Sequence, residues 1–236
     1  MRRLWASCAA AVVMAAGSVS AQDMTQDNPV VVELYTSQGC SSCPPADALM
    51  TELAGRDDVI ALALHVDYWD YIGWKDSFAS PDYTNRQRGY ARASGHRTIY
   101  TPQMIVGGVD HVVGFKPMKL ADLIDTHQEA EPAVDLQLSR EGDTLTIRAE
   151  GVTPLPASIL VQLVRYLPES TVEIRKGENA GRTITYANIV NDWEMISGWD
   201  GTGVLELTAE VTGPEPLVVI LQEAGHGAIL AATRLR

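Results

Sequence analysis

Cys40 and Cys43 are separated by two serines, a spacing that suits either a reversible disulfide or a soft metal ion. A redox cysteine attacks as a thiolate, and the unpaired N–H groups at the N-terminus of a helix stabilise that charge. Pro44 and Pro45 follow the pair, and proline is tolerated in the first turn of a helix. We therefore predict that Cys40 attacks, and that Cys43, one helical turn further on and less exposed, resolves the mixed disulfide.

The N-terminus has the pattern of a secretory signal. Residues 1–3 include two arginines, residues 4–16 are apolar, and residues 19–21 are of the small-x-small type that precedes cleavage. We predict a removed signal over residues 1–21 and a periplasmic or secreted protein. A retained membrane anchor is the alternative, but a span needs about 20 apolar residues. Cleavage also removes Cys8, and the remaining pair closes too short a loop to act as a structural staple.

The elements around the cysteines have the order of a βαβ unit. A β-branched run at 30–35 precedes the pair, helical spacing of apolar residues follows over 46–53, and an unalternating apolar run at 59–66 predicts a second, fully covered strand. Further elements are expected as a helix over 81–93, a strand over 98–106, a hairpin strand over 111–115 and a helix over 117–130.

The pattern of apolar residues changes after Pro132, in the second half of the chain. Short stretches of alternating apolar residues, separated by turns, predict an all-β sandwich-like domain.

The net charge of −12 argues against nucleic acid and anionic membrane surfaces as partners. Arg86 and Arg88, on the helix expected over 81–93, are interpreted as part of a solvated face.

Two levels of resemblance accompany these patterns. Residues 32–35 and 40–44 resemble the strand, Cys-x-x-Cys and helix entry of the thioredoxin-like superfamily, and Thr101 with Pro102 resembles its cis-proline. More narrowly, the stretches at 33–47, 65–70, 100–103 and 177–182 resemble DUF1223, a family of exported bacterial proteins without an established activity.

The resemblance implies an α/β thioredoxin-like domain over residues 28–131, followed by the β-sandwich-like domain over 133–236. It also implies that the Thr101-Pro102 peptide is cis and faces the cysteines, with the Thr101 backbone free to pair with a substrate strand. An ordinary trans proline at a strand edge is the alternative. The motif at 177–182 is a candidate to cover the cysteines.

Further residues are candidates for the site. Glu33 falls where many thioredoxin-like proteins keep a buried acid that moves a proton for the resolving cysteine; a solvated edge residue is the alternative. Trp69, Tyr71 and Trp74 form either a substrate-binding aromatic rim or part of the core. His65 is either a structural histidine or a catalytic one that reaches the cysteines from the carboxyl end of its strand.

Three functions follow. The leading hypothesis is an exported thiol–disulfide oxidoreductase that acts on proteins or small thiols, with Cys40, Cys43, Thr101, Pro102 and Glu33 as its catalytic site and an unidentified redox partner. It needs no cofactor beyond the cysteine pair. The second is a copper(I)- or zinc-handling protein that binds metal through Cys40, Cys43 and His65. The third is a partner-binding protein in which the thioredoxin-like part is an idle scaffold.

Overall fold

The computed structural model describes residues 29–235. The predicted signal at residues 1–21, with Cys8, lies outside these residues. Within them, no helix is long and apolar enough to cross a membrane.

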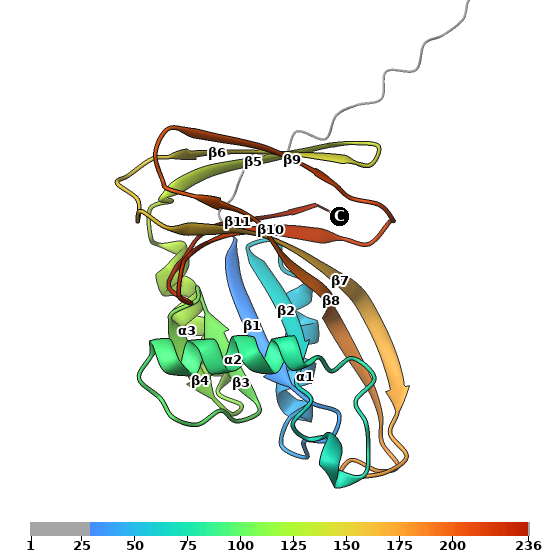
Figure 1. Cartoon of the computed structure of the whole chain (residues 1–236). Coiled ribbons are helices and arrows are strands. Elements are labelled where there is room, and N and C mark those ends of the chain that lie inside the picture. The colour runs from blue at the N-terminus through green and yellow to red at the C-terminus, as the bar shows by residue number, and fades with distance from the viewer. Residues whose placement is uncertain (1–28, 236) are drawn as a thin grey trace, which may run out of the picture.

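One eight-stranded mixed sheet runs through the molecule (Figure 1). Its strands, in spatial order, are β11 (Ile229–Leu235), β10 (Leu217–Glu223), β7 (Ile159–Glu173), β8 (Thr183–Trp199), β2 (Val59–His65), β1 (Val30–Thr36), β3 (Gln103–Val106) and β4 (Asp110–Val113). The central strands β1 and β2 are parallel and buried along their whole length. Strands covered on both faces need no polar alternation, which explains their continuous apolar runs.

Three helices cover the sheet beside its central strands. α1 (Pro44–Ala54) and α3 (Pro117–Gln128) share a core with Val32 and Leu34 on one face. On the opposite face, α2 (Pro81–Ala93) packs through Tyr83 and Tyr90 against Val31 and Tyr35 of β1. Successive β1 residues therefore point alternately toward α1 and toward α2.

A second sheet of three strands forms a separate layer at the top of Figure 1. It consists of β5 (Val134–Glu141), β6 (Thr144–Gly151) and β9 (Val204–Glu210). These strands enclose an apolar core with β7, β10 and β11. The residues expected to form a sandwich-like domain thus also contribute strands to the large sheet, where β8 joins β2 through a bridge between Ala63 and Ile189.

This shared sheet brings distant segments to the edge where β1 ends. The long β7–β8 hairpin carries its tip to the bottom of Figure 1, beside the short helix η1 (Asp70–Ile72) that follows β2. The β3 strand pairs antiparallel with β1, with Gln103 opposite Tyr35. The cysteine loop (residues 37–43) therefore lies where β1, β2, β3 and the β7–β8 hairpin meet.

Candidate functional site

The two cysteines form a disulfide between β1 and α1. Cys40 and Cys43 are bonded to each other, and their Cα atoms are 5.4 Å apart. Cys43 is the N-cap of α1, and prolines occupy the first helical positions. The free N–H groups and the positive dipole end of this helix favour a thiolate at the pair.

Both cysteines are buried, so they differ little in exposure. Cys40 is 1% exposed and Cys43 is 0% exposed. The serines between them are exposed, and the Cys40 Sγ lies 3.4 Å from the Ser42 Oγ. Burial arises because segments distant in sequence pack over the cysteine loop, which local spacing does not reveal.

The β7–β8 loop (residues 174–182) is one of these segments. The side-chain amide of Asn179 donates hydrogen bonds to the backbone carbonyls of Gln38 and Cys40, both at 2.9 Å. The Asn179 carbonyl oxygen accepts a bond from Arg182 at 3.1 Å, and Glu178 accepts one from the Ser41 N–H at 3.3 Å. These contacts place the motif at 177–182 against the backbone of the cysteine loop.

The segment between β2 and α2 is the second segment that packs against the cysteine loop. A Cβ added at Gly39 would lie 3.1 Å from the Ile72 Cδ1 and 3.2 Å from the Trp69 Cβ, so a larger residue would push this segment away. The Trp74 indole N–H donates to the Gln38 side-chain oxygen at 2.8 Å. Gly39 is thus a point of close approach immediately before Cys40.

The Thr101-Pro102 peptide is cis, as predicted. Because Gln103 pairs with Tyr35, continuing the register places Pro102 opposite Thr36, at the edge where the cysteine loop begins. The Thr101 hydroxyl accepts a hydrogen bond from the Trp69 indole at 2.7 Å. These contacts tie the cis peptide to the segment that packs on Gly39.

The three predicted rim residues differ in exposure. Tyr71 is 81% exposed, whereas Trp69 and Trp74 are half-buried and use their indole N–H groups in the bonds just described. The rings of Trp69 and Tyr71 are stacked, with 6.4 Å between their centroids and 13° between their planes. Tyr71 is the member that is open to a partner.

Glu33 is buried, but it lies away from the cysteines. Its carboxylate accepts hydrogen bonds from Arg86 at 2.8 and 2.9 Å, from Tyr35 at 2.9 Å and from Tyr90 at 2.6 Å. Arg86 and Tyr90 belong to α2, so Glu33 faces the side of the sheet opposite α1. Arg86 is therefore not on a solvated face: burial lowers its pKa, yet the Glu33 carboxylate raises it above the ordinary value.

A buried polar cluster, formed by Asp47, His65, Asp76 and Tyr186, lies beside the end of β1. The His65 Nδ1 and the Asp76 Oδ2 are 2.7 Å apart, and both side chains are fully buried. The same Asp76 oxygen accepts the Gln38 N–H at 2.8 Å. The Tyr186 ring packs edge-on against His65, with 4.9 Å between centroids.

Asp47 connects this cluster to α1. It lies four residues after Cys43, on the same face of the helix, and accepts a hydrogen bond from the Thr36 hydroxyl at 2.7 Å. Burial raises the pKa of Asp47 to about 7, although the Thr36 hydrogen bond and the charge of Arg182 act to lower it. Asp47 is thus an acid that changes charge near neutral pH beside the resolving cysteine.

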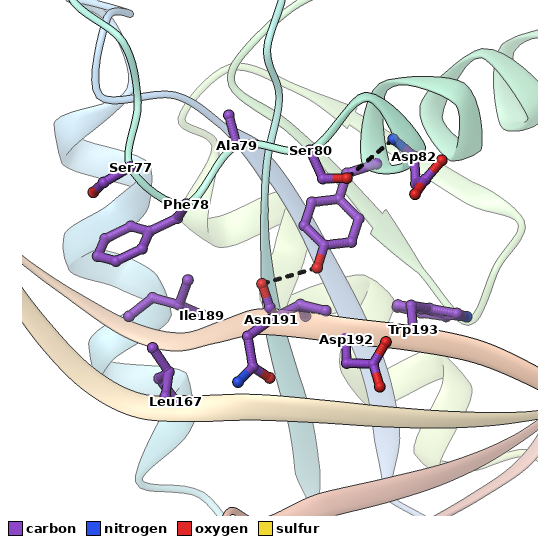
Figure 2. A pocket seen from close by; sticks show the side chains of 12 residues that line it. Ser77, Phe78, Ala79, Ser80, Asp82, Leu167, Ile189, Asn191, Asp192 and Trp193 are labelled. Carbon is purple, nitrogen blue, oxygen red and sulfur yellow. Dashed lines mark hydrogen bonds between the residues drawn. The ribbon is translucent and has the colours of Figure 1, made fainter.

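A cleft of about 470 Å³ lies between the segment after η1 and β8 (Figure 2). Phe78, Leu167 and Ile189 line one end, and Asp82 and Asp192 lie toward the other. Phe78 also packs against His65, with 5.2 Å between ring centroids. The cleft and the buried polar cluster therefore share this aromatic wall.

The alternative metal ligands do not form a site in the described structure. Cys40 and Cys43 are joined as a disulfide, and His65 is bonded to Asp76. Over residues 29–235, no group of three or more His, Cys, Asp or Glu side chains is arranged to hold a metal ion.

Comparison with known proteins identifies the family of this chain. The profile of the family described as "Protein of unknown function (DUF1223)" matches residues 31–222. The chain belongs to the DUF1223 family. The matched range of DUF1223 includes the cysteine loop, the cis peptide and the β7–β8 loop. No curated protein matches the chain.

A solved structure resembles this DUF1223 protein along most of its length. It is the crystal structure of protein AGR_C_4864 from Agrobacterium tumefaciens, with 33% identity, 89% of this chain and 95% of that chain covered, and a TM-score of 0.75. An endonuclease/exonuclease/phosphatase structure from Beutenbergia cavernae was also matched, with 44% of this chain and 23% of that chain covered, 19% identity and a TM-score of 0.20.

Sequence reasoning did not identify Asp47 or Asp76 as members of this DUF1223 site. One signal was available: Asp47 stands between Ala46 and Met50 on the apolar face of the predicted helix, where an acid is out of place. Asp76 carries no such signal, because its partner Gln38 is 38 residues away along the chain. Asn179 belongs to the motif at 177–182, but its individual contacts could not be predicted from that motif.

Proposed function

We propose that this protein is an exported, periplasmic or secreted, thiol–disulfide oxidoreductase. The observation that carries the proposal is the Cys40–Cys43 disulfide at the N-terminus of α1, on the same sheet edge as the cis Thr101-Pro102 peptide. The strand order β2-β1-β3-β4, with helices on both faces, supports a thioredoxin-like unit around the pair.

The proposed exchange proceeds in two steps. The Cys40 thiolate attacks a substrate disulfide, forms a mixed disulfide and releases one substrate thiolate. The Cys43 thiolate then attacks the Cys40 sulfur, closes the Cys40–Cys43 disulfide and releases the second substrate thiolate. Two electrons pass from the cysteine pair to the substrate, and a redox partner restores the reduced pair. The same steps in reverse oxidise a substrate dithiol.

Asp47 is the residue we propose as the base for Cys43, in place of Glu33. A free thiol has a pKa of about 8.5, so an acceptor that titrates near neutral pH suits it. The pKa of about 7 at Asp47 meets this requirement, and its position on the Cys43 face of α1 supplies proximity. Glu33 is held by Arg86 on the other face of the sheet.

The aromatic pair Trp69 and Tyr71 is proposed to receive the substrate. Trp69 is anchored to Thr101, and Tyr71 stacks on it while remaining open to solvent. A protein segment that pairs with the Thr101 backbone would pass beside these rings. This arrangement favours protein substrates over small thiols, since large exposed aromatics contribute most to binding polypeptides.

Single-cysteine variants test the proposal. Reduced Cys43→Ala should accumulate a mixed disulfide when it attacks a disulfide-linked peptide and releases one peptide thiol, whereas Cys40→Ala should accumulate none and should lose reduction of a model disulfide. Mass spectrometry identifies the adduct, and Ser42→Ala is a matched control in the same loop. Failure of the wild-type protein to exchange thiols across a range of redox buffers would contradict the proposal and would leave the scaffold hypothesis.

A further inference from the structure

The buried polar cluster contains polar atoms that the rest of the described chain does not satisfy. The Asp47 Oδ2, the His65 Nε2 and the Tyr186 hydroxyl are buried and have no hydrogen-bond partner within residues 29–235. Buried polar atoms without a partner are rare, and each one calls for a specific explanation. These three belong to residues that interact with one another, so a single explanation can serve all of them.

The hydrogen-bond pattern assigns the proton on His65. The Asp76 Oδ2 accepts from both the Gln38 N–H and the His65 ring, and the Asp76 Oδ1 accepts from the Phe78 N–H at 2.9 Å. A carboxylate that only accepts requires the hydrogen to lie on the His65 Nδ1. The His65 Nε2 then presents a lone pair to the interior of the cluster.

The three atoms have the donor and acceptor pattern of a water site. A water molecule can donate to the His65 Nε2 and the Asp47 Oδ2 and accept from the Tyr186 hydroxyl, which gives it three partners. An internal water typically makes about three such bonds. Burial also raises the pKa of Tyr186, which keeps its hydroxyl protonated and available as the donor.

We propose that Asp47, one internal water and the His65–Asp76 pair form a proton relay that serves Cys43. This inference rests on the proposed thiol–disulfide exchange. When Cys43 attacks, its thiol proton passes to the Asp47 carboxylate, and the water transfers a proton onward to the His65 Nε2. Asp76 stabilises the imidazolium that forms, and the proton finally returns to the departing substrate thiolate. No electron moves in the relay, so the balance of the exchange is unchanged.

His65 and Asp76 are positioning residues in this scheme, and Asp47, one helical turn after Cys43, is the proposed first proton acceptor. The groups that face Asp47 come from every element around it. They are Thr36 on β1, His65 on β2, Asp76 after η1, Arg182 in the β7–β8 loop and Tyr186 on β8. Among these, the Thr36 hydrogen bond and the charge of Arg182 lower the pKa of Asp47, and the charge of Asp76 raises it.

The Asp76→Asn variant distinguishes the proton relay from a purely electrostatic effect of Asp76 on Asp47. The two predict opposite changes in the rate at which Cys43 reacts. If Asp76 acts only through its charge, its removal lowers the pKa of Asp47, and Cys43 reacts faster at pH 6. If the relay operates, the neutral amide no longer stabilises the imidazolium that forms, so the His65 Nε2 becomes a poorer proton acceptor. The attack by Cys43 is then slower by about tenfold or more at both pH 6 and pH 7.

The reaction of the reduced protein with the chromogenic disulfide 5,5′-dithiobis(2-nitrobenzoate) measures this step. Attack by Cys40 releases the first thionitrobenzoate, and attack by Cys43 releases the second, so stopped-flow absorbance separates the two. We expect Asp76→Asn to slow only the second release. Phe78→Leu is the matched control, since it alters a contact of the His65 ring without changing the cluster's polar atoms, and it should leave the pH profile unchanged.

Two results would overturn the relay. One is a second release in Asp76→Asn that is unchanged or faster at pH 6. The other, which needs no variant to fold, is a wild-type His65 imidazole ¹⁵N spectrum that stays constant while Asp47 titrates. If the wild-type protein released no second thionitrobenzoate, the proposed function itself would fail, which distinguishes that outcome from failure of the relay alone.

Discussion

The Asn179 amide donates a hydrogen bond to the Cys40 carbonyl at 2.9 Å, although 139 residues separate the two along the chain. The same amide also donates to the Gln38 carbonyl. One side chain of the β7–β8 loop therefore holds the backbone on either side of Gly39. Because Cys40 is buried and its backbone is bonded to this loop, we expect reaction at Cys40 to require movement of the segments around it.

Asn179→Ala is expected to expose the disulfide. The substitution leaves two buried carbonyls without their donor, which costs about 1–3 kcal/mol and weakens the closed loop. The rate of disulfide reduction by dithiothreitol should rise about tenfold. Glu178→Gln is the control, since that exposed side chain accepts only the 3.3 Å bond from Ser41. Equal reduction rates in Asn179→Ala and wild type would show that the loop does not limit access.

The Glu33–Arg86 pair is expected to stabilise the fold without affecting the chemistry of the cysteines. Glu33→Gln leaves Arg86 without its buried counter-charge, and loss of one partner from such a pair costs about 3–5 kcal/mol. Urea unfolding measures the loss. Arg88→Ala, at an exposed position of the same helix, should change stability by less than about 0.5 kcal/mol. A Glu33→Gln variant that slows Cys43 while remaining stable would restore Glu33 as the base.

Asp47 makes stability depend on pH. Its pKa is raised from 3.8 to about 7 in the folded protein, so the folded state holds a proton that the unfolded chain releases. The contribution of Asp47 to the free energy of unfolding is therefore complete below about pH 4 and is lost as the pH rises to about 7. Asp47→Asn cannot ionise, so its stability relative to wild type should rise by roughly 4 kcal/mol between these limits.

Urea unfolding of the Asp47→Asn variant and wild type at pH 4 and pH 8 tests this expectation. Thr36→Val provides a matched comparison, because removal of the Thr36 hydrogen bond raises the pKa of Asp47 further and extends the pH window upward. A stability difference between Asp47→Asn and wild type that does not vary with pH would contradict the assignment.

Tyr71→Ala is expected to affect protein substrates selectively. The side chain is 81% exposed, so its loss should leave the thermal unfolding temperature within about one degree of wild type. Reduction of a disulfide between two aromatic-rich peptides should show a several-fold higher KM with little change in kcat, whereas reduction of glutathione disulfide should be unaffected. Equal effects on both substrates would argue against an aromatic docking site.

Local sequence was sufficient for the elements that carry the cysteines. The β-branched run before Cys40 and the prolines after Cys43 predicted the strand and the helix start, and both were confirmed. The resemblance to relatives supplied the cis peptide at Pro102 and the contact of residues 177–182 with the cysteine loop. These features could be predicted because each depends on residues that are close together along the chain or on an extended motif shared with relatives.

The roles of the charged residues could be assigned only once the fold was known. A strand residue points to one of two faces, and the sequence around Glu33 does not say which face α1 covers. The structure places Glu33 toward α2 and Asp47 toward the cysteine edge, so it changes which acid we propose as the base.

The cysteine pair, the helix that begins after it and the family of the chain could all be predicted from the amino-acid sequence. The burial of the pair, the bonds from Asn179 to its backbone and the cluster of Asp47, His65, Asp76 and Tyr186 became visible only in the folded chain. These features join residues that lie far apart along the chain. Hydrogen bonds and burial depend on which strands share a sheet, and β8 reaches β2 from the far end of the sequence.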